Sequence, residues 1–305
     1  NGHVLQLGVD DDVIYEIPKG KERTTEKLRN EFIRICSEIR KKDGLPQVNH
    51  PFDVSFSTRY NSEFWDMVEI FESMEIWNGA TPFAAGTINA KAFKKWLSLL
   101  DEGKRLTATT GSDTHNIYGD DYFGMTEWLD WLMDIVMKHP EIYPVHMNEN
   151  VAYLTWLYNK VWPRLLSWVE QSNTPSTIHN YVYTNGKNQP QEILQAIREG
   201  HSFISNGPLV TAEVNGVSYG EKAVLKDRTG TLSVHVFSKK PINHLWMYTG
   251  ADKKVELCAK ADAAEGGFMY DIAADELDFG DAAWVLFVAD GGENNLAISN
   301  PILFA

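Results

Sequence analysis

The feature that most constrains this chain is a set of short apolar segments that each end in polar side chains. Residues 46–49 lead into His50, and residues 106–110 lead, after two small residues, into Asp113 and His115. Helical patterns, with apolar residues at steps of three and four, separate these segments along the chain. Such alternation indicates an α/β domain whose strands pair in parallel.

We therefore expect a definite order of elements before residue 207. The predicted strands cover residues 4–7, 46–49, 74–77 and 106–110. The predicted helices cover residues 24–42, 89–102 and 191–199. Residues 64–73 are helical or irregular in this interpretation. Residues 120–175 are rich in tryptophan and tyrosine and fit two further helices. Core packing explains these aromatic residues most simply, and a wall facing a substrate is the alternative.

From about residue 207 the pattern changes. Short segments rich in valine, isoleucine and phenylalanine, such as 232–237 and 284–288, are separated by glycine, asparagine and aspartate. This pattern is typical of an antiparallel β-sandwich, here of about 95 residues. We therefore predict two domains, 1–206 and 207–305, with residues 120–175 as an insertion in the first.

Composition excludes several classes of protein. The chain has 305 residues and is 43% hydrophobic, which is enough apolar material for a packed core. Its net charge of −14 repels phosphate backbones, so nucleic acid is not an expected partner. No apolar run approaches the ~18 residues of a membrane-spanning helix, so no membrane is expected either. The chain opens at Asn1 without a signal-like stretch; we expect it to start inside a longer protein, which leaves its compartment open.

The predicted strand ends supply ligands suited to a divalent metal ion. Imidazole and carboxylate groups bind Zn²⁺, Mn²⁺ and Fe²⁺, and strand ends carry the sites of parallel α/β domains. Asp113 and His115 point to the same side of an extended chain, so they can share an ion. A turn capped by Asp113 would explain the same triplet. Other histidines, including His179, His235 and His244, are expected to be hydrogen-bonded core residues.

Five segments occur in a specific order along the chain: Asn-His-Pro at 49–51, Glu-Ile-Trp-Asn-Gly at 75–79, Gly-Ser-Asp-Thr-His at 111–115, and the stretches 192–208 and 297–302. In this order they resemble the PHP (polymerase and histidinol phosphatase) family, and more closely its CehA/McbA-like branch of metallohydrolases. The resemblance covers most of the chain outside residues 120–175.

The resemblance implies a distorted (β/α)7 barrel followed by the β-sandwich. It implies two or three divalent ions at the C-terminal ends of the barrel strands. The implied metal ligands are His3, His50, Asp113 and His115. Four further side chains are implied near the metals or the substrate: Glu75, Asn78, His201 and Asn206.

The chain departs from the family at its first motif, a His-x-His pair, which does not occur here. We expect that pair upstream of Asn1, and a degenerate member without it is the alternative. The ligands present then form about half of a complete site and hold fewer ions than three. The barrel would also lack its opening strands, so another segment or a second subunit of an oligomer would have to cover the exposed edge.

The predicted activity is that of a metal-dependent hydrolase, first of all a phosphoesterase acting on a small phosphorylated molecule. Metal-activated hydroxide is the expected nucleophile, and Asp113 is the residue expected to orient it and accept its proton. Arg59 and Arg105 would favour phosphate if they lie at the rim. Two alternatives stay open: an ester, amide or carbamate hydrolase on the same site, and a non-catalytic binding protein with a degenerate barrel. With half of the site absent, this chain alone is expected to have weak activity or none.

Overall fold

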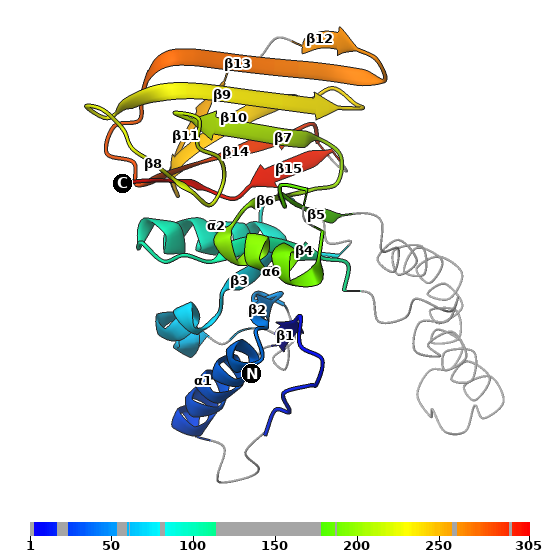
Figure 1. Ribbon diagram of the computed structural model, residues 1–305, viewed down its shortest axis with the longest axis vertical. Helices are drawn as coiled ribbons and strands as arrows, with labels where there is room; N and C mark the ends of the chain where they lie inside the picture. The colour runs from blue at the N-terminus through cyan, green and yellow to red at the C-terminus, as the bar shows by residue number, and fades with distance from the viewer. Residues whose placement is uncertain are drawn as a thin grey trace, which may run out of the picture. The chain divides into compact units, whose positions relative to one another are not determined.

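A computed structural model of the chain (Figure 1) describes residues 3–16, 24–53, 60, 62–79, 83–113, 178–186, 188–257, 261–292 and 295–305. The residues up to Gly111 and from Ile178 onward belong to one compact unit. Residues 112–177 form a second unit, of which the described part is Ser112 and Asp113. The helices predicted within 120–175 lie outside the described residues.

Four strands form the first sheet, in the order β1-β2-β3-β4: His3–Leu7 (β1), Leu45–Asn49 (β2), Ser73–Asn78 (β3) and Thr107–Gly111 (β4). Strands β2, β3 and β4 run parallel, as the alternation of strands and helices predicts. Strand β1 runs antiparallel to β2, so the prediction of parallel pairing is wrong for β1.

Local contacts hold the segment that follows β1. The chain reverses at Gly8, whose φ of 72° is accessible to glycine at little cost. The side chain of Gln6 then bonds the backbone of Val13, accepting from its N–H at 2.7 Å and donating to its carbonyl oxygen at 2.9 Å. The chain therefore folds back beside β1 before the first helix begins.

The helices form where the apolar spacing predicts them. Helix α1 (Thr25–Lys41) is capped by Thr24, whose hydroxyl accepts from the backbone N–H of Lys27 at 3.2 Å. Ile88–Asp101 (α2), Pro190–Glu199 (α6) and the 3-10 helix Ser62–Ile70 (η2) follow. Among the described residues, no helix combines the length and the hydrophobicity needed to cross a bilayer.

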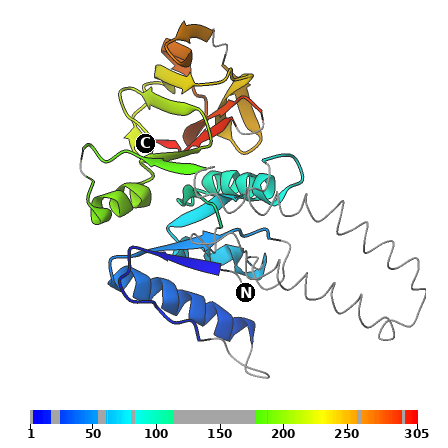
Figure 2. The same cartoon turned by 90° about the vertical axis from the view of Figure 1, so that its right-hand side faces the viewer.

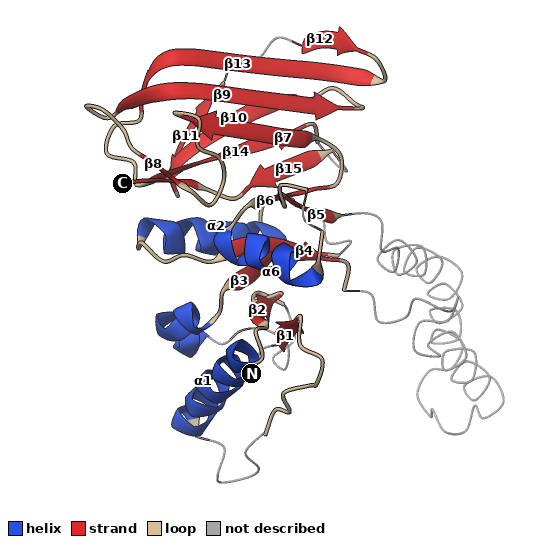
Figure 3. Ribbon diagram, in the orientation of Figure 1, coloured by secondary structure: helices blue, strands red, loops and turns tan. Residues whose placement is uncertain are grey.

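The remaining strands build two sheets, coloured red in Figure 3. The larger sheet has the order β11-β10-β14-β15-β6-β5 and also includes β16 and β8. The smaller has the order β12-β13-β9-β7. Their bounds are His179–Val182 (β5), Ser202–Ser205 (β6), Leu209–Val214 (β7), Lys222–Ala223 (β8), Thr229–Ser238 (β9), His244–Gly250 (β10), Lys253–Glu256 (β11), Ala261–Ala264 (β12), Gly267–Asp278 (β13), Trp284–Asp290 (β14), Leu296–Ser299 (β15) and Ile302–Phe304 (β16).

Strand β14 lies between two apolar layers. Its side chains point alternately to the two sides. Trp284 and Leu286 pack in the core that includes α2, and Val285 and Phe287 pack in the core between the larger and the smaller sheet. Figures 1 and 2 both show α2 between β1–β4 and the sandwich-like sheets. The predicted α/β class is therefore confirmed, with sandwich-like sheets in the tail. The described strands form open sheets.

Candidate functional site

Two histidines meet at the edge of the sheet where the parallel strands end. Because β1 is antiparallel to β2, its first residue, His3, pairs with Asn49, the last residue of β2. His3 Nδ1 lies 3.2 Å from His50 Nε2, and the two rings are perpendicular, with an interplanar angle of 77°. His50 is buried and His3 is exposed. The reversed direction of β1, which the sequence analysis did not foresee, is what brings these imidazoles together.

A buried carboxylate on β3 holds the backbone of His50. Glu75 is 3% exposed, and its Oε2 accepts from the backbone N–H of His50 at 2.6 Å and from Asn78 Nδ2 at 3.2 Å. His50 has a φ of 24°, a backbone conformation that costs free energy for a residue with a side chain. The bond to Glu75 stabilises this conformation and therefore the position of the ring.

The end of β4 is shaped to accept Glu75. A Cβ atom on Gly111 would lie 2.7 Å from Glu75 Oε1, so the close approach requires glycine there. Asp113 follows two residues later with a φ of 54°, and it belongs to the second unit of the chain. His115 lies outside the described residues. The structure therefore brings together His3, His50 and Glu75, with Asn78 bonded to the carboxylate.

A row of polar side chains continues from the site into the sheet. Gln47 of β2 is buried, and its Oε1 accepts from Ser73 Oγ at 3.0 Å and from Thr109 Oγ1 at 2.8 Å. These residues share one face of the sheet, whereas Val48 and Met74 lie on the other face in the apolar core. One face of β2–β4 is thus polar, buried and internally hydrogen-bonded, which suits a site interior.

The histidine pair fits two neighbouring ligands of one metal ion. Two imidazole nitrogens at Zn–N distances of about 2.0–2.1 Å in a tetrahedral site lie about 3.3 Å apart. The observed 3.2 Å matches that spacing, and it also matches a hydrogen bond between neutral rings. His50 Nδ1 is buried and lacks a hydrogen-bond partner in the described part of the chain, with Asp53 Oδ2 3.8 Å away. Within that same part, no group of three or more His, Cys, Asp or Glu residues is placed to hold a metal.

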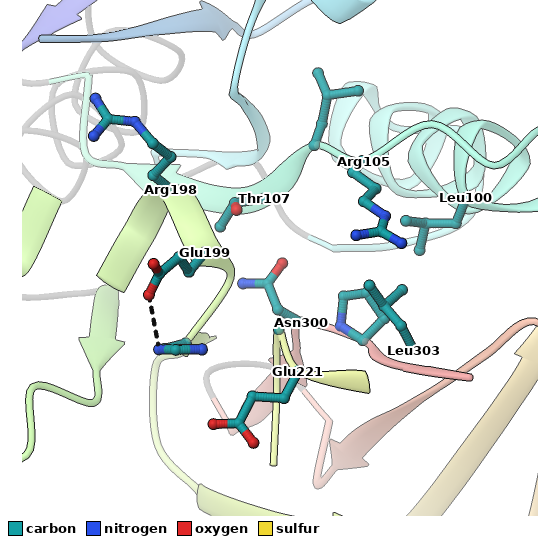
Figure 4. A pocket seen from close by; sticks show the side chains of 12 residues that line it. Leu100, Arg105, Thr107, Arg198, Glu199, Glu221, Asn300 and Leu303 are labelled. Carbon is teal, nitrogen blue, oxygen red and sulfur yellow. Dashed lines mark ion pairs between the residues drawn. The ribbon is translucent and has the colours of Figure 1, made fainter. Parts of the chain in front are cut away.

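Two predicted site residues lie elsewhere. Asn206 joins two strands of the larger sheet: its Oδ1 accepts from the backbone N–H of Leu296 at 2.8 Å. His201 lines a cleft of about 420 Å³ together with Arg105 and Thr107. Figure 4 shows this cleft, with Arg105 and Thr107 labelled. Thr107 begins β4 and Gly111 ends it, so the structure does not bring His201 or Arg105 to the His3–His50 pair. Arg59 lies outside the described residues.

Three other histidines correct an expectation. His179, His235 and His244 were predicted in the core, and all three are exposed. His235 and His244 each bond a carboxylate on a neighbouring strand, Asp271 and Glu256 respectively. Buried and exposed positions alternate along β9 and β10, and His235 and His244 occupy exposed positions.

Two asparagines that the sequence analysis did not assign to the site complete β4. Asn300 and Asn180 bond the backbone of Ala108 and Thr110, respectively, on the strand edge that β3 leaves unpaired. The signal for Asn300 was its place in Ser-Asn-Pro, between two short apolar runs, but its partner is 192 residues away.

No family model matches the sequence, and no curated protein or solved structure matches it.

Proposed function

We propose that this chain is a metal-dependent hydrolase whose site lies at the C-terminal edge of β2, β3 and β4. The observation that carries the proposal is the His3–His50 pair, whose ring nitrogens lie 3.2 Å apart, with the backbone N–H of His50 bound by the buried carboxylate of Glu75. A group that orients a ligand raises metal affinity, and Glu75 can orient His50 through its backbone. In this proposal β1–β4 are part of a distorted (β/α)7 barrel.

Each residue has a role in the proposed site. His3 and His50 bind the metal as neutral imidazoles, and Asp113 and His115 are the further ligands that the sequence predicts. Glu75 orients His50 through its backbone, and Asn78 holds the Glu75 carboxylate in place. A divalent ion held by these residues would lower the pKa of water and polarise a substrate oxygen. Asp113 would accept the proton that the attacking water loses.

The first substrate class is a small phosphorylated molecule, and the second is an ester, amide or carbamate. Both classes react by attack of water on an electrophilic centre whose oxygen gains negative charge, so one donor set serves both. Turnover distinguishes the two classes.

The test measures metal binding and hydrolysis on the same protein. The chelator-treated chain is titrated with Zn²⁺ and Mn²⁺ by calorimetry, and then assayed with 4-nitrophenyl phosphate and 4-nitrophenyl acetate. We expect His3→Gln and His50→Gln to weaken binding at least ~10-fold, and Glu75→Gln to weaken it ~10–100-fold, as for other residues that orient a ligand.

The matched control is His244→Gln, which removes an exposed imidazole bonded to Glu256 on the sandwich. It should bind metal like the unchanged chain. Failure of the unchanged chain to bind either ion, or equal binding by His50→Gln, would contradict the proposal. Cleavage of the acetate but not of the phosphate would favour the second substrate class, provided that chelator abolishes it and added metal restores it.

A further inference from the structure

Three side chains on the smaller sheet have the connectivity of a nucleophilic triad. Ser233 Oγ lies 3.0 Å from His235 Nε2, and His235 Nδ1 lies 2.5 Å from Asp271 Oδ1. A carboxylate only accepts hydrogen bonds, so Nδ1 carries the proton and Nε2 is left to accept from the serine hydroxyl. These are the two imidazole nitrogens that serine hydrolases use for the same two partners.

The sheet itself fixes this arrangement. Ser233 and His235 are two residues apart on β9, so both side chains point to the outer face. Asp271 of β13 pairs directly with His235 in the antiparallel register. Directly opposed side chains on neighbouring strands lie within contact distance. The three groups are therefore held by backbone pairing rather than by a loop.

Ser233 and His235 also line a cavity of about 430 Å³. Thr211 of β7, which pairs with His235, lies on its wall, and so does Tyr183, whose hydroxyl donates to the carbonyl of Val210 at 3.2 Å. The side chain of His235 is 54% exposed, so a ligand in this cavity can reach it. The nucleophile and the base thus face a space large enough for a small acyl group.

We propose that Ser233, His235 and Asp271 form a second hydrolytic site, which cleaves small carboxylic esters without a metal. Ser233 Oγ bonds to the ester carbonyl carbon while its proton passes to His235 Nε2. The bond to the alcohol then breaks, and the leaving alcohol takes that proton. Water, activated in the same way by His235, releases the acid and restores the serine. Asp271 keeps the imidazole in the correct tautomer, and Thr211 can donate to the carbonyl oxygen.

The charges around the cavity select the substrate class. Two carboxylates, Glu213 and Glu221, line it, and no lysine or arginine does so among the described residues. Glu213 pairs with Ser233 across β7 and β9, so it lies beside the nucleophile. Negative charge there repels an anionic substrate. The site therefore takes neutral or cationic esters, unlike a site for phosphorylated molecules.

The experiment keeps the two proposed sites apart. The full chain, held in excess chelator, is treated with a neutral fluorophosphonate that labels activated serines, and the modified residue is located by mass spectrometry. Turnover of 4-nitrophenyl acetate is measured in the same buffer. We expect labelling at Ser233, loss of both signals in Ser233→Ala, and at least a ~10-fold slower reaction in His235→Gln and Asp271→Asn.

Thr231→Val is the matched control, because Thr231 lies on the same face of β9 and bonds Asn215 instead of the triad. It should react like the unchanged chain. Glu213→Gln should speed hydrolysis of an anionic ester, 4-nitrophenyl hemisuccinate, relative to the acetate. The proposal is overturned if Ser233 is labelled no faster than in the urea-unfolded chain, or if His235→Gln leaves the rate unchanged. Neither result depends on whether the chain binds metal.

Discussion

The side chain of Asn300 bonds both backbone groups of Ala108, accepting from its N–H at 2.7 Å and donating to its carbonyl oxygen at 3.1 Å. These are the bonds that a further strand would otherwise supply. Asn300 Nδ2 also contacts Ser202 at its carbonyl oxygen, 3.1 Å away, and at its hydroxyl, 2.9 Å away. One amide near the end of the chain thereby connects β4, which leads to the proposed metal site, with β6 of the larger sheet.

Asn300→Ala should lower the free energy of unfolding by about 3–5 kcal/mol, because several buried backbone groups would lose their partners at a cost of about 1–3 kcal/mol each. Urea denaturation followed by circular dichroism measures this loss. Asn180→Ala is the comparison, because Asn180 makes the equivalent two bonds to the backbone of Thr110. Asn180 is exposed, so water can replace these bonds and the loss of stability should be smaller. A loss below about 1 kcal/mol for Asn300→Ala would show that its bonds do not hold β4.

Gly111→Ala should disturb the proposed site. The added Cβ would lie 2.7 Å from Glu75 Oε1, so the carboxylate must move and its bond to the N–H of His50 must lengthen. We expect a loss of about 1–3 kcal/mol in stability and weaker metal binding, measured by urea denaturation and calorimetry.

The control for this substitution is Gly250→Ala in β10, where the new Cβ would meet Lys253 Cβ at an ordinary 3.5 Å. It should cost much less stability than Gly111→Ala, because a contact at this distance requires no neighbouring atom to move. Equal effects of the two substitutions would mean that the contact with Glu75 is unimportant.

Glu31 should make stability depend on pH. The hydrogen bond from the Arg34 guanidinium, with a further bond from the backbone N–H of Glu16, holds the pKa of the Glu31 carboxyl below its usual value of 4.5. Because the pKa of Glu31 is lower in the folded than in the unfolded chain, its carboxylate stabilises the folded state above pH 4.5. This contribution disappears as the pH falls through the pKa that Glu31 has in the folded chain.

Glu31→Gln should therefore cost about 1–2 kcal/mol at pH 7, and this difference should shrink steadily below pH 4.5. Thermal denaturation between pH 3 and pH 7 measures it. Glu38→Gln, which removes the more exposed partner of Arg34, should cost less than about 0.5 kcal/mol at every pH. A difference at Glu31 that grows in acid would show that the sign is wrong.

Bound metal should stabilise the folded chain. A ligand present at 100 times its dissociation constant adds about 2.7 kcal/mol to the free energy of unfolding, so Zn²⁺ should raise the melting temperature and chelator should reverse the change. His50→Gln should remove this response, because it deletes the buried ring of the pair. A rise of the same size in His50→Gln would place the metal elsewhere.

Local sequence patterns predicted the elements well, because each depends on neighbouring residues. The spacing of Leu28, Phe32, Ile35 and Ile39 places one face of α1 in the core, and Thr24 caps it as a hydroxyl residue before a helix often does. His50 was found in the same way, as a polar residue after an apolar run, whereas Glu75 and Asn78 came from the family resemblance. The role of His3, His50, Asp113 and His115 as metal ligands stays a prediction.

The sequence by itself determined which segments become strands and helices and which polar residues follow them, since hydrophobic periodicity acts over a few residues. Tertiary structure alone decided that β1 runs antiparallel and so carries His3 to His50. It also decided that Asn300 bonds β4 and that Asp271 lies beside His235. Those partners are 36 to 192 residues apart in the chain. Strand direction, register and packing select such distant pairs, and no local pattern of side chains encodes them.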